Sequence, residues 1–63
     1  MCEYKVLLDG ELILDEVIYA RAEGGRVILR NVLGESKVLD NCVIVEVNVE
    51  ETKLVLARAG ALG

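Results

Sequence analysis

The chain has 63 residues, of which 54% are hydrophobic and 29% charged, and its formal net charge is −4. This length fits one domain over residues 1–63. No histidine is present, which removes most general acid–base schemes, histidine-activated nucleophiles and the commonest zinc ligands. Serine and threonine occur once each, at Ser36 and Thr52, so we predict that the protein is not an enzyme. The acidic charge also disfavours nucleic acid and anionic membranes as partners.

The short length predicts self-association. A chain of this size buries only about 60% of the surface that its unfolded form exposes, so its stability is marginal. Disulfides, a structural metal or oligomerisation are the usual remedies. Cys2 and Cys42 allow at most one bridge within the chain, and a structural zinc site would lack two further ligands. We therefore predict a homodimer.

The sequence also indicates a compartment. No apolar run approaches the roughly 18 residues of a membrane span, and residues 1–3 do not open a signal peptide. Two distant cysteines without a secretory segment are typical of reduced thiols. We expect a soluble, cytoplasmic protein without a membrane partner.

Short apolar runs separated by turn signals predict an all-β fold, and ten valines and four isoleucines agree with it. The Gly-Gly pair at 24–25 is the clearest hairpin signal, because both glycines tolerate a positive φ. Strands at such spacings are typical of a small antiparallel barrel, followed by a loosely docked tail at 57–63. The expected strands cover residues 4–8, 17–23, 26–33, 35–39, 42–49 and 53–58.

Two of these segments need comment. Residues 11–23 contain no helix breaker and have partly helical spacing, so a helix remains the alternative to a strand that follows a turn at 14–16. Both faces of residues 17–22 are apolar, as in a strand that a partner chain covers or that crosses a barrel. In residues 42–49 strict alternation puts four valines on one face, which predicts a half-buried strand.

Cys2 is the residue whose position is chemically unusual. Its thiolate and its own backbone nitrogen can close a five-membered chelate ring, and the amine of Met1 can close a second. If Met1 is removed, the free amine belongs to Cys2 itself. Square-planar N,S coordination suits nickel(II) and also copper(II). The alternative is an incidental or buried thiol near the terminus.

One Cys2 supplies too few donors for a four-coordinate site. A two-fold axis that brought two Cys2 residues together would supply two thiolates and two nitrogens. The homodimer predicted from the chain length could therefore also complete a metal site. Metal binding should weaken as the pH falls, because the ligands must lose protons.

The other candidate residues have simpler interpretations. We predict that Cys42 is a small hydrophobic filler, although a second-ligand role or a bridge to Cys2 stays open. The acidic pairs at 15–16 and 50–51 lie at predicted turns and lack the spacing of a calcium loop. Tyr4 and Tyr19 lie in apolar runs, which favours packing in the core or a dimer over stacking on bases.

Six short stretches of the sequence together carry a family resemblance. They are MCEYKV at 1–6, DEV at 15–17, EGGRV at 23–27, LGE at 33–35, VEVN at 45–48 and KLVL at 53–56. In these stretches the chain resembles the CooT family of small nickel-binding proteins, which are linked to maturation of carbon monoxide dehydrogenase. The hydrogenase maturation chaperones also begin Met-Cys, but their following Ala-Ile-Pro-Gly is absent here.

The resemblance implies a homodimer of small SH3-like barrels that holds one nickel(II) at its interface, with Cys2 of each protomer and Met1 as the site residues. The implied role is that of a metallochaperone, with carbon monoxide dehydrogenase or its nickel-insertion machinery as partner. An RNA-binding SH3-like module is the alternative, in which Arg21, Arg26 and Arg30 gather on the first hairpin.

Overall fold

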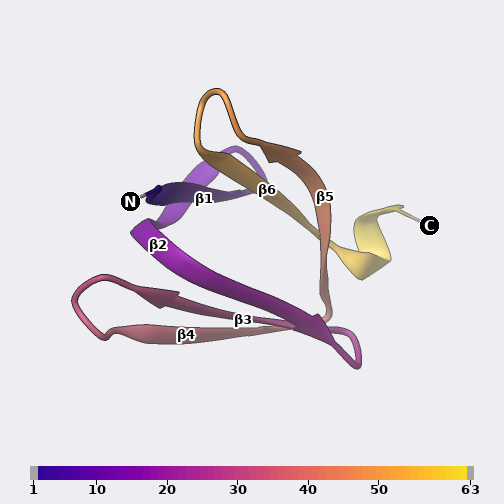
Figure 1. Cartoon of the computed structure of the whole chain (residues 1–63). Coiled ribbons are helices and arrows are strands. Elements are labelled where there is room, and N and C mark those ends of the chain that lie inside the picture. Colours follow the sequence, from indigo (N-terminus) through magenta and orange to yellow (C-terminus); the bar gives the residue numbers. More distant parts are fainter. Residues whose placement is uncertain (1, 63) are drawn as a thin grey trace.

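The computed structural model describes residues 2–62, with side chains for residues 2–60, and contains six strands and one short helix (Figure 1). The one helix in this range, η1 (Ala59–Leu62), is a single 3-10 turn after the last strand. The strands are β1 (Tyr4–Leu8), β2 (Glu11–Glu23), β3 (Arg26–Asn31), β4 (Ser36–Asp40), β5 (Cys42–Asn48) and β6 (Lys53–Arg58).

All six strands belong to one sheet in the order β4-β3-β2-β1-β6-β5. Four of the neighbouring pairs are antiparallel and joined by short turns, whereas β1 and β6 pair in parallel, with Val6 opposite Leu54. The first and last strands of the chain thus meet in the middle of the sheet. The predicted all-β class is confirmed, but the prediction of a wholly antiparallel arrangement is wrong at this pair.

Strand β2 gives the sheet its shape, because its 13 residues serve two partners. Its first half pairs with β1 and its second half with β3, and the change falls at Val17, which pairs with both Tyr4 and Asn31; the preceding Glu16 has a φ of 55°. The backbone N–H of Val32 donates to the Glu16 carbonyl (3.0 Å), which fixes the bend. The helical alternative for residues 11–23 is therefore wrong, and the turn predicted at 14–16 is a kink within one strand.

The bend folds the sheet over a small core. Eight hydrophobic residues are buried, and they come from every strand except β4. Strands β1, β3 and β6 each contribute alternate residues, as the period of two requires. The buried residues are Val6, Leu8, Val17, Val27, Leu29, Cys42, Leu54 and Leu56.

The sheet does not close into a barrel, so that part of the prediction is wrong. Strands β4 and β5 form its two edges. Strand β1 is only five residues long and accompanies β2 no further than Val17, which leaves the second half of β2 with a partner on one side only. Strand β5 approaches the β2–β3 turn at its first residue, where the N–H of Cys42 donates to the Gly25 carbonyl (3.1 Å).

The valines of β5 are more exposed than the alternation predicts. Val45 and Val47 are 48% and 57% exposed, and Val49 in the following turn is 66% exposed. A bulge at Val45 interrupts the pairing of β5 with β6, and no strand covers this edge within the described residues. The predicted half-buried face is therefore largely open in a single chain.

The described part of the predicted tail at 57–63 begins within a strand. Strand β6 includes residues 57 and 58 and continues into η1, and the N–H of Ala59 donates to the Asn41 carbonyl (2.8 Å). No helix within residues 2–62 has the length and apolar character needed to cross a membrane.

Candidate metal site at the N-terminus

Cys2 lies just before β1, on a segment whose position the neighbouring turn fixes. The N–H of Lys5 donates to the carbonyl of Thr52 (2.9 Å), which ties the start of β1 to the β5–β6 turn. Cys2 carries a free thiol and is exposed. The alternative of a buried thiol at this position is therefore wrong. Met1, the other predicted ligand, lies outside the described residues.

Cys42 has a different role. Its side chain is 3% exposed in the core, and its sulfur donates weakly to the Asp40 carbonyl (3.5 Å). Both cysteines are free, so the bridge between Cys2 and Cys42 is absent. The prediction that Cys42 is a small core filler is confirmed, and the protein presents one accessible thiol.

The described residues of one chain bring no further ligands together. No group of three Cys, Asp or Glu side chains in residues 2–62 has the spacing to hold a metal ion. Asp15 instead accepts a hydrogen bond from the N–H of Glu16 (2.7 Å), and Glu51 lies 3.4 Å from the ammonium of Lys53. A metal centre at Cys2 would therefore need donors from the terminal backbone and from a second molecule.

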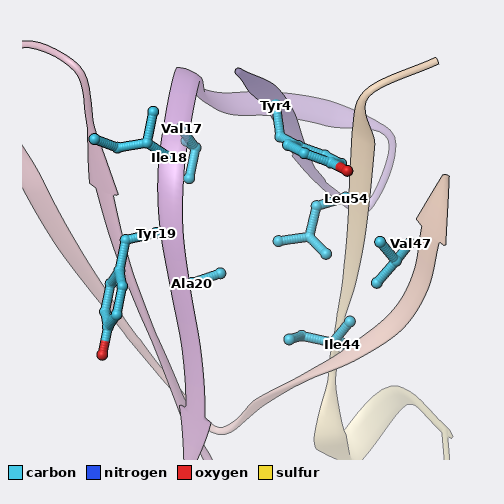
Figure 2. A pocket seen from close by; sticks show the side chains of 8 residues that line it. All are labelled: Tyr4, Val17, Ile18, Tyr19, Ala20, Ile44, Val47 and Leu54. Atoms are coloured by element: carbon cyan, nitrogen blue, oxygen red, sulfur yellow. The ribbon is translucent and has the colours of Figure 1, made fainter. Parts of the chain in front are cut away.

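An open apolar cleft of about 270 Å³ is lined by the second half of β2, by strands β5 and β6, and by Tyr4 at the start of β1. Figure 2 shows Tyr4, Leu54 and Ile44 facing Val17 and Ala20 across it, whereas Ile18 and Tyr19 project from the other side of β2. Tyr4 lines the cleft, and Cys2 lies two residues before Tyr4 in the chain. The eight lining residues are Tyr4, Val17, Ile18, Tyr19, Ala20, Ile44, Val47 and Leu54.

The arginines expected on the first hairpin do share one face, because Tyr19 pairs with Arg30 and Arg21 with Ile28 across β2 and β3. The guanidinium of Arg30 lies 4.9 Å from the centre of the Tyr19 ring, and Tyr19 is 38% exposed. The prediction that Tyr19 packs in the core is wrong for a single chain. Ion pairs on this face are Arg21 with Glu23 (3.1 Å) and Arg26 with Asp40 (3.7 Å), which leave little positive charge for a phosphate backbone.

Fold and site together define a small all-β protein whose one accessible thiol stands next to its N-terminus and beside an apolar cleft. Comparison with known protein families assigns the chain to one of them. Residues 1–57 match a family model described as CO dehydrogenase accessory protein CooT. The chain belongs to the CooT family. A search of curated proteins gave no match.

Membership confirms the resemblance drawn from the sequence and assigns the protein an accessory role for CO dehydrogenase. Such a role agrees with the prediction that the chain is not an enzyme. The sequence alone indicated Cys2 as a candidate ligand, which stays a prediction, and it did not identify the cleft. One sequence signal pointed toward the cleft: both faces of residues 17–22 are apolar. Ala20 belongs to this apolar stretch, lines the cleft and is exposed.

Proposed function

We propose that the protein is a nickel-binding metallochaperone for the maturation of CO dehydrogenase, and that one Ni(II) lies between the two protomers of a homodimer. Cys2 of each protomer supplies a thiolate, and the terminal backbone, including Met1, supplies nitrogen. The observation that carries this proposal is the accessible thiol of Cys2 in a chain of the CooT family. We expect the protein to act in the cytoplasm, where thiols such as its two free cysteines stay reduced.

The donor chemistry fits nickel. The Cys2 sulfur and its backbone nitrogen close a five-membered ring, and two such rings make a four-coordinate N,S set with the square-planar geometry that Ni(II) adopts. One chain offers only half of this set, because its described residues hold no other ligand cluster. Copper(II) binds such ligands more tightly still, so selectivity would depend on which metal the cell supplies.

The position of the thiol suits a carrier more than a permanent metal site. Structural metal centres are closed and fully coordinated by their protein. Cys2 is exposed, so ligands of a client protein could approach the bound metal and replace the thiolates one at a time. The nickel ion is thus cargo, and the chain contributes donors rather than catalytic groups.

The test is a titration of metal-free protein with nickel, followed by absorption of the thiolate-to-metal transition and by native mass spectrometry. We expect one nickel per dimer for the wild type and at least a 100-fold weaker affinity for Cys2→Ser. Cys42→Ser is the matched control and should keep the affinity, because its sulfur is 3% exposed in the core. Equally tight binding by Cys2→Ser would refute the proposal.

A further inference from the structure

We propose that the side of strands β2, β3 and β4 that faces away from the core is a docking surface for an acidic segment of a partner protein. This inference goes beyond the proposed function, because it needs neither the thiol of Cys2 nor a metal ion. The same strands point Val27 and Leu29 into the core on their other side. We call the docking surface the outer face, and its residues are Ile18, Tyr19, Arg21, Ile28, Arg30 and Val38.

The pairing of the three strands determines which side chains of the outer face lie together. Residues directly opposite each other on antiparallel strands point to the same side of the sheet. Tyr19 pairs with Arg30, whereas Arg21, Ile28 and Val38 form one row across the three strands. Successive residues on one side of a strand are two positions apart, so the two rows are adjacent.

The outer face exposes hydrophobic side chains to water. The pairing of β2 with β3 shifts register between Val17 and Tyr19, and Ile18 and Tyr19 both project from the side of β2 away from the cleft (Figure 2). Ile18 is 47% exposed and Val38 is 54% exposed, and Ile28 is half-buried. Apolar residues gathered on one exposed face mark a surface of association.

The charge of the outer face is opposite in sign to that of the chain. It carries Arg21 and Arg30 and no carboxylate, whereas the net charge of the chain is −4. Arg30 lies over the Tyr19 ring and forms no ion pair among the described residues. Arg21 pairs with Glu23, but both side chains are more than half exposed, and such a pair contributes little to stability. Both guanidinium groups can therefore bind carboxylates of another molecule.

The spacing of the two arginines fits an extended segment. Arg21 and Arg30 are diagonal neighbours on adjacent strands, a relation that puts residues about 7–8 Å apart. Alternate residues of an extended chain point to the same side at intervals of about 6.6 Å. Two glutamates separated by one residue can therefore present one carboxylate to each arginine. Apolar side chains that flank the two glutamates would contact the hydrophobic part of the outer face.

The same charges disfavour other occupants. A second copy related by a two-fold axis would present this face to itself and so bring arginines against arginines. Nucleic acid binding depends on neutralising several phosphates, and two guanidinium groups are few for that purpose. An acidic protein segment needs no more than these two.

The experiment titrates isotopically labelled, metal-free protein with the capped peptide Leu-Ser-Glu-Ser-Glu-Ser-Leu and follows the backbone amide chemical shifts. We expect saturable shifts at residues 18–21, 28–30 and 36–38, but not at residues 43–47, with a dissociation constant on the order of 1 mM. The same peptide with lysine in place of both glutamates should cause no such shifts.

Two pairs of variants test the residues that carry the proposal. Arg30→Glu should raise the dissociation constant by about tenfold or more, because attraction becomes repulsion. Arg58→Glu, at an exposed arginine outside the outer face, is its control and should change the constant by less than about twofold. Tyr19→Ala should weaken binding by about threefold or more, whereas Val47→Ala, at an exposed valine of β5, should not. The spectra themselves show that each variant is folded, and Arg30→Gln replaces Arg30→Glu if that variant is not.

The proposal is overturned if the acidic peptide causes no saturable shifts, if the lysine peptide binds equally well, or if the Arg30 and Arg58 variants have equal effects. Concentration-dependent shifts of the same residues without peptide would assign the outer face to a second copy. Shifts caused by a uridine oligonucleotide but not by the peptide would assign it to nucleic acid, and either result also overturns the proposal. Nickel takes no part in these measurements, so failure of the proposed function would leave their outcome unchanged.

Discussion

The amide of Asn31 donates a 2.7 Å hydrogen bond to the carboxylate of Glu35, and its carbonyl oxygen accepts from the N–H groups of Leu33 and Glu35. Asn31 is 4% exposed and is the one buried polar residue described. Its side chain adds to the backbone bonds of the β3–β4 turn, in which the N–H of Asn31 donates to the Glu35 carbonyl (3.0 Å). Strand β4 is an edge strand whose one strand partner is β3, so this turn supports the pairing that attaches it to the sheet.

We expect Asn31→Leu to lower the free energy of unfolding by about 2–3 kcal/mol, because three part-buried hydrogen bonds are lost together. Asn48→Ala is the control. Asn48 accepts a comparable turn bond from the N–H of Glu51 (2.9 Å) at an exposed site, and its loss should cost about 0.5–1 kcal/mol. Urea denaturation followed by far-UV circular dichroism measures both, and equal losses would contradict the buried role of Asn31.

Gly25 gives a second stability prediction. It has a φ of +80° in the β2–β3 turn, and its carbonyl accepts the bond from Cys42. Gly25→Ala should lower the free energy of unfolding by about 1–2 kcal/mol, because a residue with a Cβ atom is sterically strained in the left-handed region. Gly60→Ala, in η1 where no positive φ is required and space is open, should change the unfolding free energy by less than about 0.5 kcal/mol. Thermal unfolding of both variants measures the two losses, and equal losses would contradict the special role of Gly25.

The affinity for nickel should decrease as the pH is lowered. Each Cys2 thiol must release its proton to bind, and the nitrogen ligands of the proposed site must lose protons as well, so the affinity falls by at least on the order of 100-fold for each pH unit. A competition titration against a chelator of known affinity, repeated between pH 6 and pH 8, measures this slope. A slope of about tenfold per unit or less would contradict a site with two thiolates.

Nucleic acid should bind weakly if at all. Arg21 and Arg26 are paired with carboxylates and Arg30 is stacked on Tyr19, so the most basic face of β2 and β3 has few free cations. We expect no salt-dependent change in the fluorescence anisotropy of a labelled single-stranded RNA between 50 and 200 mM salt. Salt-dependent binding that Arg30→Ala abolishes would restore the RNA-binding alternative.

Local signals predicted the parts of the fold that depend on neighbouring residues. The strands Tyr4–Leu8 and Lys53–Arg58 have the predicted bounds, because each is a short apolar run between polar turns. Residues 11–16 were missed as strand, since Asp15 and Glu16 look like a turn and the chain bends there without leaving the sheet. The parallel pairing of β1 with β6 links residues about 50 positions apart, and no local pattern encodes it.

For the candidate site too, features within one residue could be predicted from the sequence, and features that depend on distant strands could not. The thiol of Cys2 could be proposed as a ligand from the sequence, because chelation depends on atoms of the same residue. The exposure of Val45 and Val47 was mispredicted, since alternation shows which residues share a face and not whether another strand covers it. The cleft is open because β1 is shorter than β2. This relation between two strands cannot be predicted from the residues of either strand alone.

The separation of β1 from η1 has a practical consequence for handling the protein. The strand begins on one side of the molecule and η1 lies on the other (Figure 1). An affinity tag or a surface tether fused before Met1 would replace the terminal amine with an amide and crowd the thiol. The same attachment placed after η1 leaves both groups as the cell makes them, so immobilised protein for studies of nickel transfer should be anchored by that end.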